Sequence, residues 1–310
     1  MQRIAITGAG GRLGRALVDA LAAADTHLLE VARPHLDITV AQDRAQIEAW
    51  RPDVIVNAAA WTDVDGCSRD PDRAFAVNGH AAGELAAVAA RCAARFIQVS
   101  TNEVFAGDAE APYDPGDPVR PRSVYGASKA LGEELVTASG ASSTIVRTAW
   151  LFGPHGQNFV TKILAAAEHA ASASTPLRVV DDEWGNPTWI PALAERIRAL
   201  VNAASPSIVH VAGAPPTSRH GWAVAVLEAA QSQARIVAIS SDAFVRASDP
   251  PRRAILALVP SESLDWQRAT IRYVRGLAAA SSSSSDAMRD EERPSKGPTA
   301  RSSASDRSPR

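Results

Sequence analysis

The chain has 310 residues, a formal net charge of −2 and 46% hydrophobic residues, which is typical of a soluble globular protein. The length suffices for one large α/β domain or two smaller ones. No basic stripe is present, which argues against nucleic acid as a partner, and no apolar run reaches membrane-spanning length. The first residues read as a strand rather than a signal peptide. Cys67 and Cys92 fit no metal or redox spacing, which favours a reducing compartment. We therefore predict a cytoplasmic enzyme.

Strands and helices alternate along the first half of the chain. Apolar, strand-like stretches occur at 3–7, 27–32, 53–57, 95–100 and 144–149. Helical patterns lie between them, up to residue 24, over 41–50, over 71–94 and around Tyr125. Alternation of this length indicates βαβ units and predicts an α/β fold with a Rossmann-type, doubly wound parallel sheet.

The pattern loosens after residue 150. Helices are expected over 158–170, 191–203 and 221–231, and strands over 177–180 and 208–211. We therefore predict an NAD(P)-binding domain over 1–150 and a smaller substrate-binding lobe over 151–278, interleaved with the sheet. Residues 279–310 are rich in Ser, Asp, Glu, Arg, Lys and Pro and include the serine run 281–285. That composition predicts a disordered tail.

Three glycines with regular spacing follow the first strand and open the first helix. The first permits a tight turn, the second lets the backbone approach a pyrophosphate, and the third lets the helix pack on the sheet. The free N–H groups and positive dipole end of that helix attract phosphates. We predict a dinucleotide site that includes Gly8, Gly11, Arg12, Leu13 and Gly14.

The end of the second strand indicates which dinucleotide binds. An acidic residue there binds a ribose 2′-hydroxyl, whereas an arginine accommodates a 2′-phosphate. Arg33 is better placed than Glu30, so we predict NADPH, with NADH as an alternative. Asp37 and Ile38 follow, where a carboxylate and an apolar side chain can bracket an adenine. The third strand ends in side chains small enough for a cofactor to lie against the backbone: Ala58, Ala59 and Ala60.

A tyrosine and a lysine, Tyr125 and Lys129, lie four residues apart on one face of a predicted helix. A nearby ammonium favours the phenolate, so we expect the lysine to lower the pKa of the tyrosine. Thr101 ends the fourth strand at the same edge of the sheet. A hydrogen-bond donor aimed at a growing oxyanion, together with a tuned general acid, suits ketone reduction.

In this order the motifs resemble the extended short-chain dehydrogenase/reductase superfamily, and most closely its dTDP-4-dehydrorhamnose reductases. The likeness covers residues 1 to about 278. Six stretches carry it: TGAGGRLG (7–14), RPDVIVNAAAWTDVD (51–65), VSTNEVFAG (99–107), SVYGASKALGEEL (123–135), RTAWLFGPHGQNF (147–159) and DDEWGNPTW (181–189). The last two are more diagnostic than the glycines, which the whole superfamily shares.

The resemblance implies hydride transfer from a nicotinamide to the C4 ketone of a deoxysugar nucleotide. It implies that Thr101 positions the carbonyl oxygen, that Tyr125 protonates the alkoxide, and that Lys129 tunes Tyr125 and binds the nicotinamide ribose. Tyr125 and Lys129 are therefore expected to contact the cofactor as well. Candidate substrate contacts are Thr62, Val64, Glu103, Trp150 and Asn158.

Three further expectations concern contacts with the substrate. Trp150, at the end of the fifth strand, is expected to stack on the sugar or base, or else to be a core residue. The loop 184–188 is expected to close over the substrate. Arg252 and Arg253 either pair with a diphosphate or are solvated.

Some positions depart from the family pattern. The reductases usually carry Asp-Tyr after Ser-Thr, and the related 4,6-dehydratases carry Thr-Asp-Glu, with the aspartate as acid and the glutamate as base. This chain has Asn102 and Glu103 there. An amide cannot donate a catalytic proton in that way, so Glu103 favours dehydratase chemistry while Asn102 argues against it.

Glutamates that bridge a dimer through magnesium in some of these reductases match Ala16 and Pro191 here, so we predict no metal and no metal-bridged dimer. The leading hypothesis is a reductase of a dTDP-4-keto-6-deoxysugar. Two alternatives are a dehydratase or epimerase of the same superfamily, and a non-catalytic dinucleotide-binding regulatory subunit.

Overall fold

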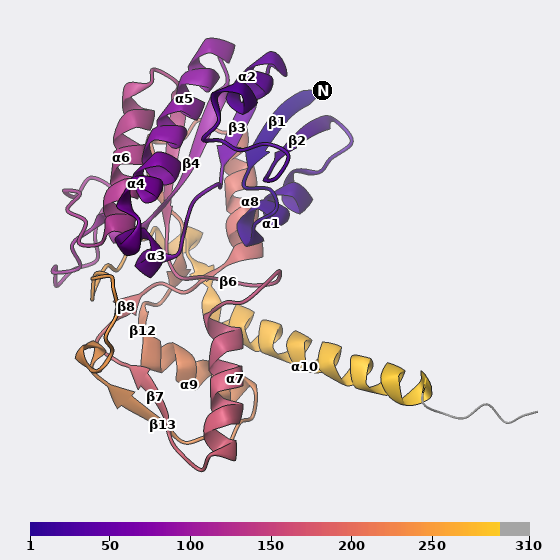
Figure 1. The fold of residues 1–310 in the computed structure, drawn as a ribbon, viewed down its shortest axis with the longest axis vertical. Coiled ribbons are helices and arrows are strands. Elements are labelled where there is room, and N and C mark those ends of the chain that lie inside the picture. The colour runs from indigo at the N-terminus through magenta and orange to yellow at the C-terminus, as the bar shows by residue number, and fades with distance from the viewer. Residues whose placement is uncertain (292–310) are drawn as a thin grey trace, which may run out of the picture.

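A six-stranded parallel sheet forms the centre of the computed structural model, which describes the backbone of residues 1–291 and the side chains of residues 1–280. The strand order is β10-β5-β4-β3-β1-β2, and every neighbouring pair is parallel (Figure 1). The predicted fold class is thus confirmed. The strands are β1 (Gln2–Thr7), β2 (Thr26–Val31), β3 (Val54–Asn57), β4 (Arg95–Thr101), β5 (Ser142–Thr148) and β10 (Ile208–His210).

Both faces of this sheet are covered by helices. Along β3, Val54 and Val56 pack into one core, and Ile55 between them packs into the other. Alternate side chains of a strand point to opposite faces, so a strand buried on both faces is apolar throughout. The first face carries α1 (Arg12–Leu21) and α8 (Ile190–Val201), and the second carries α2 (Ala41–Ala49), α5 (Ala81–Cys92) and α6 (Val124–Ala138).

The strand order reverses between β1 and β3, because β2 lies on one side of β1 and β3 on the other. At the carboxyl ends of these two strands, the backbone N–H of Ala58 donates to the carbonyl of Thr7 at 3.2 Å. Open α/β sheets bind ligands in the crevice at such a switch point. The fold therefore places the glycine-rich loop and the alanine run on either side of one crevice.

The helix expected over 71–94 is interrupted. It consists of α4 (Pro71–Ala74), a π-helical turn η1 (Phe75–His80) and α5, with α3 (Val64–Arg69) before it. Within the π-turn, Asn78 is buried, donates to Ser128 Oγ at 3.0 Å and accepts from the Trp61 backbone N–H at 2.8 Å. These bonds tie the turn to α6 and to the loop after β3. Single π-turns inside helices often mark functional sites.

The remaining elements build a smaller lobe beyond the carboxyl edge of the sheet (Figure 1). Its core packs around Trp222, which is fully buried. The chain returns to the main sheet for α8 and β10 before it re-enters the lobe. The lobe and its connections contain β6 (Leu151–Phe152), α7 (Phe159–Ser172), β7 (Leu177–Val180), β8 (Trp184–Gly185), β9 (Thr188–Trp189), β11 (Gly213–Ala214), β12 (Thr217–Ser218), α9 (Arg219–Ala229), β13 (Ile236–Ile239), β14 (Leu264–Asp265), α10 (Trp266–Glu291) and the 3-10 turns η3 (Ser241–Ala243) and η4 (Pro260–Glu262). The 3-10 turn η2 (Asn102–Val104) directly follows β4 and packs on α6.

The last helix corrects the boundary expected for the tail. Helix α10 continues to Glu291 and so includes the serine run 281–285 that was predicted to be disordered. Alanines precede that run, and an established helix extends without a new nucleation step. The rest of the predicted tail, 292–310, lies outside the described residues. Within the described part of the chain, none of the helices combines the length and apolarity needed to cross a membrane.

Candidate active site

The glycine-rich loop has the geometry expected of a pyrophosphate cradle. Gly8 has φ +71°, and a Cβ there would lie 2.8 Å from the Ala59 backbone. A Cβ at Gly14 would lie 2.0 Å from the Gly8 carbonyl oxygen. Gly11 caps the start of α1 and donates its N–H to the Gly8 carbonyl at 2.9 Å. These positions exclude any side chain, so a ligand can approach the backbone at the amino end of α1.

Two cavities meet at this loop. The first, about 660 Å³, extends over β2 toward Arg33, and the second, about 590 Å³, extends over β4 and β5 toward Tyr125. Both are lined by Gly8, Gly11, Ala58 and Ala60. A dinucleotide with its pyrophosphate at the shared glycines would place one nucleoside in each cavity.

The first cavity contains the residues predicted for the adenosine end: Arg33, Asp37, Ile38 and Ala59. Asp37 is held by the N–H and hydroxyl of Thr39, at 2.9 and 2.7 Å. The Thr39 N–H, more than the nearby Arg33 charge, lowers the pKa of the Asp37 carboxyl. Arg33 is exposed, so its guanidinium is free to meet an anionic group at this end.

The second cavity collects the predicted catalytic and substrate residues from several elements. Thr101 ends β4, Tyr125 and Lys129 lie in the first turns of α6, and Trp150 follows β5. The further predicted residues that line it are Arg12, Leu13, Gly14, Thr62, Val64, Glu103 and Asn158. Every predicted site residue therefore lines one of the two adjoining cavities.

Tyr125 does not have the lowered pKa expected from its spacing to Lys129. Burial raises the pKa of the Tyr125 phenol, and the Glu103 carboxyl raises it further, while a hydrogen bond with Thr101 opposes the rise. The expectation was wrong because the Lys129 ammonium donates instead to the Val99 carbonyl, at 2.7 Å. The phenol thus stays protonated at neutral pH, which is the form that a general acid needs.

Lys129 is buried, and burial lowers the pKa of its ammonium to about 8, against an opposing effect of Glu133. Glu133 lies one turn further along α6, where it accepts bonds from Ser100 and Arg147. Removing a cation from water favours its neutral form. Lys129 therefore changes charge close to physiological pH.

Ser123 joins the start of α6 to Glu103. Its Oγ accepts the Gly126 N–H at 3.0 Å as the cap of α6, and donates to Glu103 Oε2 at 2.9 Å. Burial raises the pKa of the Glu103 carboxyl. Asn102, the residue that departs from the family pattern, is buried and donates to the Ala254 carbonyl at 2.9 Å. Asn102 therefore connects the two parts of the fold, and Glu103 is the acidic group beside Tyr125.

The sequence analysis missed a group of charged residues on the lobe side. The Arg219 guanidinium lies 3.6 Å from the centre of the Trp150 ring. Glu183 pairs with Arg219 at 3.6 Å and with Arg246 at 2.5 Å. Lys162, like Arg219, lines the second cavity. These residues come from distant segments of the lobe with no shared motif, so no local pattern identified them.

The sequence predicted that Trp150 stacks on the sugar or base, or else is a core residue. In the structure, the Arg219 guanidinium covers one face of the Trp150 ring. A cation over an indole is itself a favourable contact. Trp150 has φ +46°, which is uncommon for a residue with a side chain. The unusual backbone turns the chain sharply after β5 and holds the indole between the sheet and the lobe. Its contact with substrate stays a prediction.

Asn158 lines the cavity, but its polar atoms are already in use. Its Oδ1 caps α7 by accepting the Val160 N–H at 3.0 Å, and its Nδ2 donates to the Gly153 carbonyl at 2.9 Å. Arg252 pairs with Asp182 and Asp242 at the surface, and neither Arg252 nor Arg253 lines the two cavities. The loop 184–188 is held in place through Asn186, which bonds to Gly213 and Leu256.

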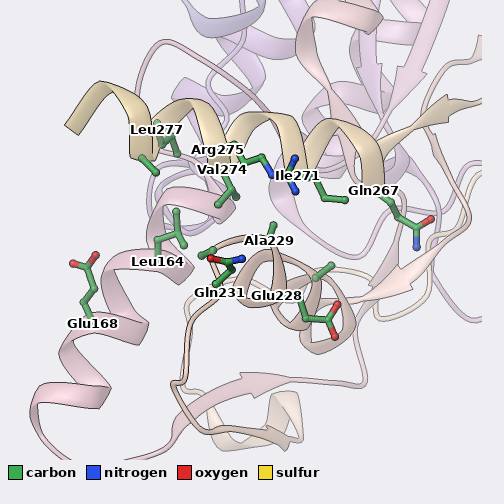
Figure 2. A pocket seen from close by; sticks show the side chains of 13 residues that line it. Leu164, Glu168, Glu228, Ala229, Gln231, Gln267, Ile271, Val274, Arg275 and Leu277 are labelled. Atoms are coloured by element: carbon green, nitrogen blue, oxygen red, sulfur yellow. The ribbon is translucent and has the colours of Figure 1, made fainter. Parts of the chain in front are cut away.

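Another groove, of about 920 Å³, lies between α7, α9 and α10 (Figure 2). Ile271 and Val274 of α10 face Leu164 of α7 across it, with Glu168 and Glu228 at its acidic rim. It contains none of the predicted site residues. Among residues 1–280, no group of three or more histidine, cysteine, aspartate or glutamate side chains is arranged to hold a metal ion.

Comparisons with known proteins give matches over most of the chain. Residues 1–275 match the family model described as RmlD substrate binding domain. A dTDP-4-dehydrorhamnose reductase of Mycobacterium tuberculosis is 38% identical over 283 residues, which cover 88% of this chain and 89% of the relative. A dTDP-4-keto-6-deoxy-D-glucose reductase of Streptomyces niveus is 39% identical over 66% of this chain and 70% of its own. The crystal structure of a dTDP-4-dehydrorhamnose reductase from Bacillus anthracis, in complex with NADP, has a TM-score of 0.82 at 28% identity, and the match covers 88% of this chain and 99% of that one.

Proposed function

Because the chain belongs to the RmlD substrate binding domain family and is an NAD(P)H-dependent oxidoreductase, we propose that it reduces the C4 ketone of a dTDP-4-keto-6-deoxysugar with NADPH. The specific reaction is dTDP-4-dehydrorhamnose to dTDP-L-rhamnose. The observation that supports it best is the second cavity, which is lined both by Thr101, Tyr125 and Lys129 and by the glycine-rich loop.

The residues present fit a bound NADPH. Gly8 and Gly14 allow the loop, the start of α1 and the Ala59 backbone to lie so close together that a Cβ at either glycine would clash, and the exposed Arg33 suits a 2′-phosphate. When bound, the reduced nicotinamide supplies the hydride. One relative is named a dTDP-4-dehydrorhamnose reductase, and the crystal structure of another dTDP-4-dehydrorhamnose reductase contains NADP. Both support a dTDP sugar as substrate and NADPH as cofactor.

Side chains of this protein position the ketone oxygen and supply the proton that the alkoxide receives. The Thr101 hydroxyl donates to the ketone oxygen and holds it in place. The Tyr125 phenol, kept protonated by burial, gives its proton to the alkoxide as negative charge develops there. The Lys129 ammonium, which also donates to the Val99 carbonyl, orients the ribose. Arg219 and Arg246 on the lobe side attract the diphosphate of the sugar nucleotide.

The test is NADPH oxidation with dTDP-4-dehydrorhamnose, followed in wild type and Tyr125→Phe. The variant should lose about 100-fold or more in kcat, the usual contribution of a positioned general acid. Tyr113→Phe is the matched control, because the Tyr113 hydroxyl bonds to Asp108 outside the cavity. An inactive wild type would defeat the proposal, and full activity in Tyr125→Phe would defeat the role of Tyr125.

Glu103 favours a second candidate, a dehydratase or epimerase that removes a proton next to the ketone. A buried carboxyl beside Tyr125 can act as that base. Turnover in deuterium oxide separates the two. A simple reductase leaves the C–H bonds next to the ketone unexchanged. Deuterium at those carbons, abolished in Glu103→Gln, would instead support the second candidate.

We also propose that the enzyme works in the cytoplasm without a metal ion. The support is its two unpaired cysteines, Cys67 and Cys92, and the absence of ligating side chains at Ala16 and Pro191. Activity should be the same in a chelator as in magnesium. Retained NADPH binding without turnover on any keto-sugar would point to a regulatory subunit.

A further inference from the structure

Three polar side chains form one buried row across the sheet. Thr7 of β1, Asn57 of β3 and Gln98 of β4 are register partners, and each is at most 1% exposed. Two residues earlier in each of these strands, the side chains on the same face are apolar and pack beneath α5 and α6. The polar row therefore lies on the face of the sheet that is covered by α6, the helix of Lys129.

The hydrogen bonds along this row run in one direction. Asn57 Oδ1 accepts from the Thr7 hydroxyl and from the Ala59 N–H, and Asn57 Nδ2 donates to Gln98 Oε1 at 2.8 Å. Gln98 Nε2 donates to the Val99 carbonyl at 3.0 Å. The Ala59 N–H can only donate and the Val99 carbonyl can only accept, so the two ends fix the orientation of both amides. Gln98 thus presents a donor, and not an acceptor, to the Val99 carbonyl.

The Val99 carbonyl lies where one side of the β-ladder has ended. Strand β3 ends opposite Gln98, whereas β4 continues past it. The Arg95 N–H donates to the Asp53 carbonyl, and alternate residues of a strand bond to the same neighbour, so the Val99 carbonyl faces the β3 side, beyond its last strand residue. In place of a ladder N–H, this oxygen accepts from Gln98 and from Lys129 Nζ, at 2.7 Å.

We propose that Gln98 is a positioning residue for Lys129, because its side-chain amide fixes the carbonyl that holds the ammonium at the second cavity. The inference rests on the role proposed for Lys129 in orienting the ribose. A carbonyl at the end of a ladder is free to tilt, and a second donor from a fully buried side chain prevents this. Gln98 lines neither cavity, so it acts only through the Val99 carbonyl.

Replacing Gln98 with an uncharged side chain changes no charge around Lys129. The charged and titratable groups near Lys129 and Tyr125 come from four elements: Tyr125 and Glu133 of α6, Arg147 of β5, Glu103 of η2 and Cys67 of α3. All of them stay in place in such a variant. A change in the titration of Lys129 therefore reports on the Val99 carbonyl.

The test follows the Lys129 ammonium by NMR of protein labelled at the lysine Cε. Lys129→Met identifies its signal among those of Lys162 and Lys296. In wild type the pKa of Lys129 should be about 8. Gln98→Met keeps the length of the side chain and removes both polar atoms. It should lower the pKa of Lys129 by about one unit, because a hydrogen bond to the charged form favours that form.

Thr7→Val is the matched control from the same row. It removes one buried hydrogen bond but leaves Asn57 bonded to the Ala59 N–H and Gln98 bonded to the Val99 carbonyl. Both variants should melt at a lower temperature than wild type, whereas Lys129 in Thr7→Val should titrate as in wild type.

A second measurement uses the unaltered protein and so does not depend on a variant that folds. The side-chain amide nitrogen of Gln98 should shift with the same midpoint as Lys129, because both groups donate to one oxygen. A Gln98 signal that stays constant through the titration of Lys129 contradicts the inference.

None of these measurements needs a substrate, so they separate the inference from the proposed reaction. An unchanged or raised pKa of Lys129 in Gln98→Met, or an equal fall in Thr7→Val, overturns the inference. If Lys129 responds as expected but wild type reduces no keto-sugar, the proposed reaction fails while the role of Gln98 stands. If wild type is active and the fall of kcat/KM at high pH follows the NMR midpoint in Gln98→Met, both stand.

Discussion

Replacing Glu133 with glutamine removes the negative charge from the buried ion pair that supports the catalytic helix. Glu133 and Arg147 have side chains only 7% and 2% exposed, and their closest atoms are 2.7 Å apart. The guanidinium makes three contacts with the carboxylate and has one further bond, to the Pro115 carbonyl. Removing one partner of such a pair leaves the other charge buried and uncompensated.

The expected cost of Glu133→Gln is about 3 to 5 kcal/mol in the free energy of unfolding, the range for breaking a buried pair. For a chain of this size that corresponds to a fall in Tm of roughly 10 °C. Urea unfolding followed by circular dichroism measures the free energy directly. Adding Arg147→Met should recover part of the loss, since the orphaned charge is then removed as well.

The exposed pair Arg91–Glu48 provides the matched control. Its two bonds, 2.9 and 2.7 Å, are as short as those of the buried pair, but its side chains are 53% and 34% exposed. Water replaces such contacts at little cost, so Glu48→Gln should unfold close to wild type. Equal losses in Glu133→Gln and Glu48→Gln would refute the reasoning, because burial would then not decide the cost.

Three further predictions concern binding and rate. Gly14→Ala should abolish NADPH binding in a fluorescence titration, because its Cβ would lie 2.0 Å from the Gly8 carbonyl oxygen; Gly116→Ala, with nothing within 4 Å, should bind normally. The value of kcat/KM should be full below the pKa of Lys129, about 8, and fall as pH rises through it, because the ammonium is the active form; a flat profile to pH ~10, near the unperturbed lysine pKa, would contradict this role. Arg219→Lys should raise KM for the sugar nucleotide about tenfold with little change in kcat, since lysine loses the planar contact with the indole; an unchanged KM places Arg219 outside substrate binding.

Local patterns predicted much of this protein correctly. The apolar run 54–56 predicted a strand buried on both faces, and the glycine spacing predicted a dinucleotide loop after β1. The i,i+4 spacing of Tyr125 and Lys129 predicted that both side chains lie on one helix face beside the same cavity. It predicted the wrong direction for the shift of the Tyr125 pKa. Spacing shows which side chains share a helix face, whereas a pKa depends on desolvation and on every nearby charge. Here the Val99 carbonyl and Glu103 decided it.

The lobe shows the limit of such reasoning. Arg219, Glu183 and Arg246 meet because three separate segments of the lobe pack together. Nothing in the local spacing of any one of them indicates the other two.

By itself, the sequence determined the sheet, the glycine-rich loop and the helix face shared by Tyr125 and Lys129, because periodicity, glycine spacing and helix geometry are local properties of the chain. The tertiary structure alone decided which charges surround the tyrosine and how the Trp150 ring is covered. These features depend on burial and on contacts between distant segments, and both arise only when the sheet and the lobe close around one cavity.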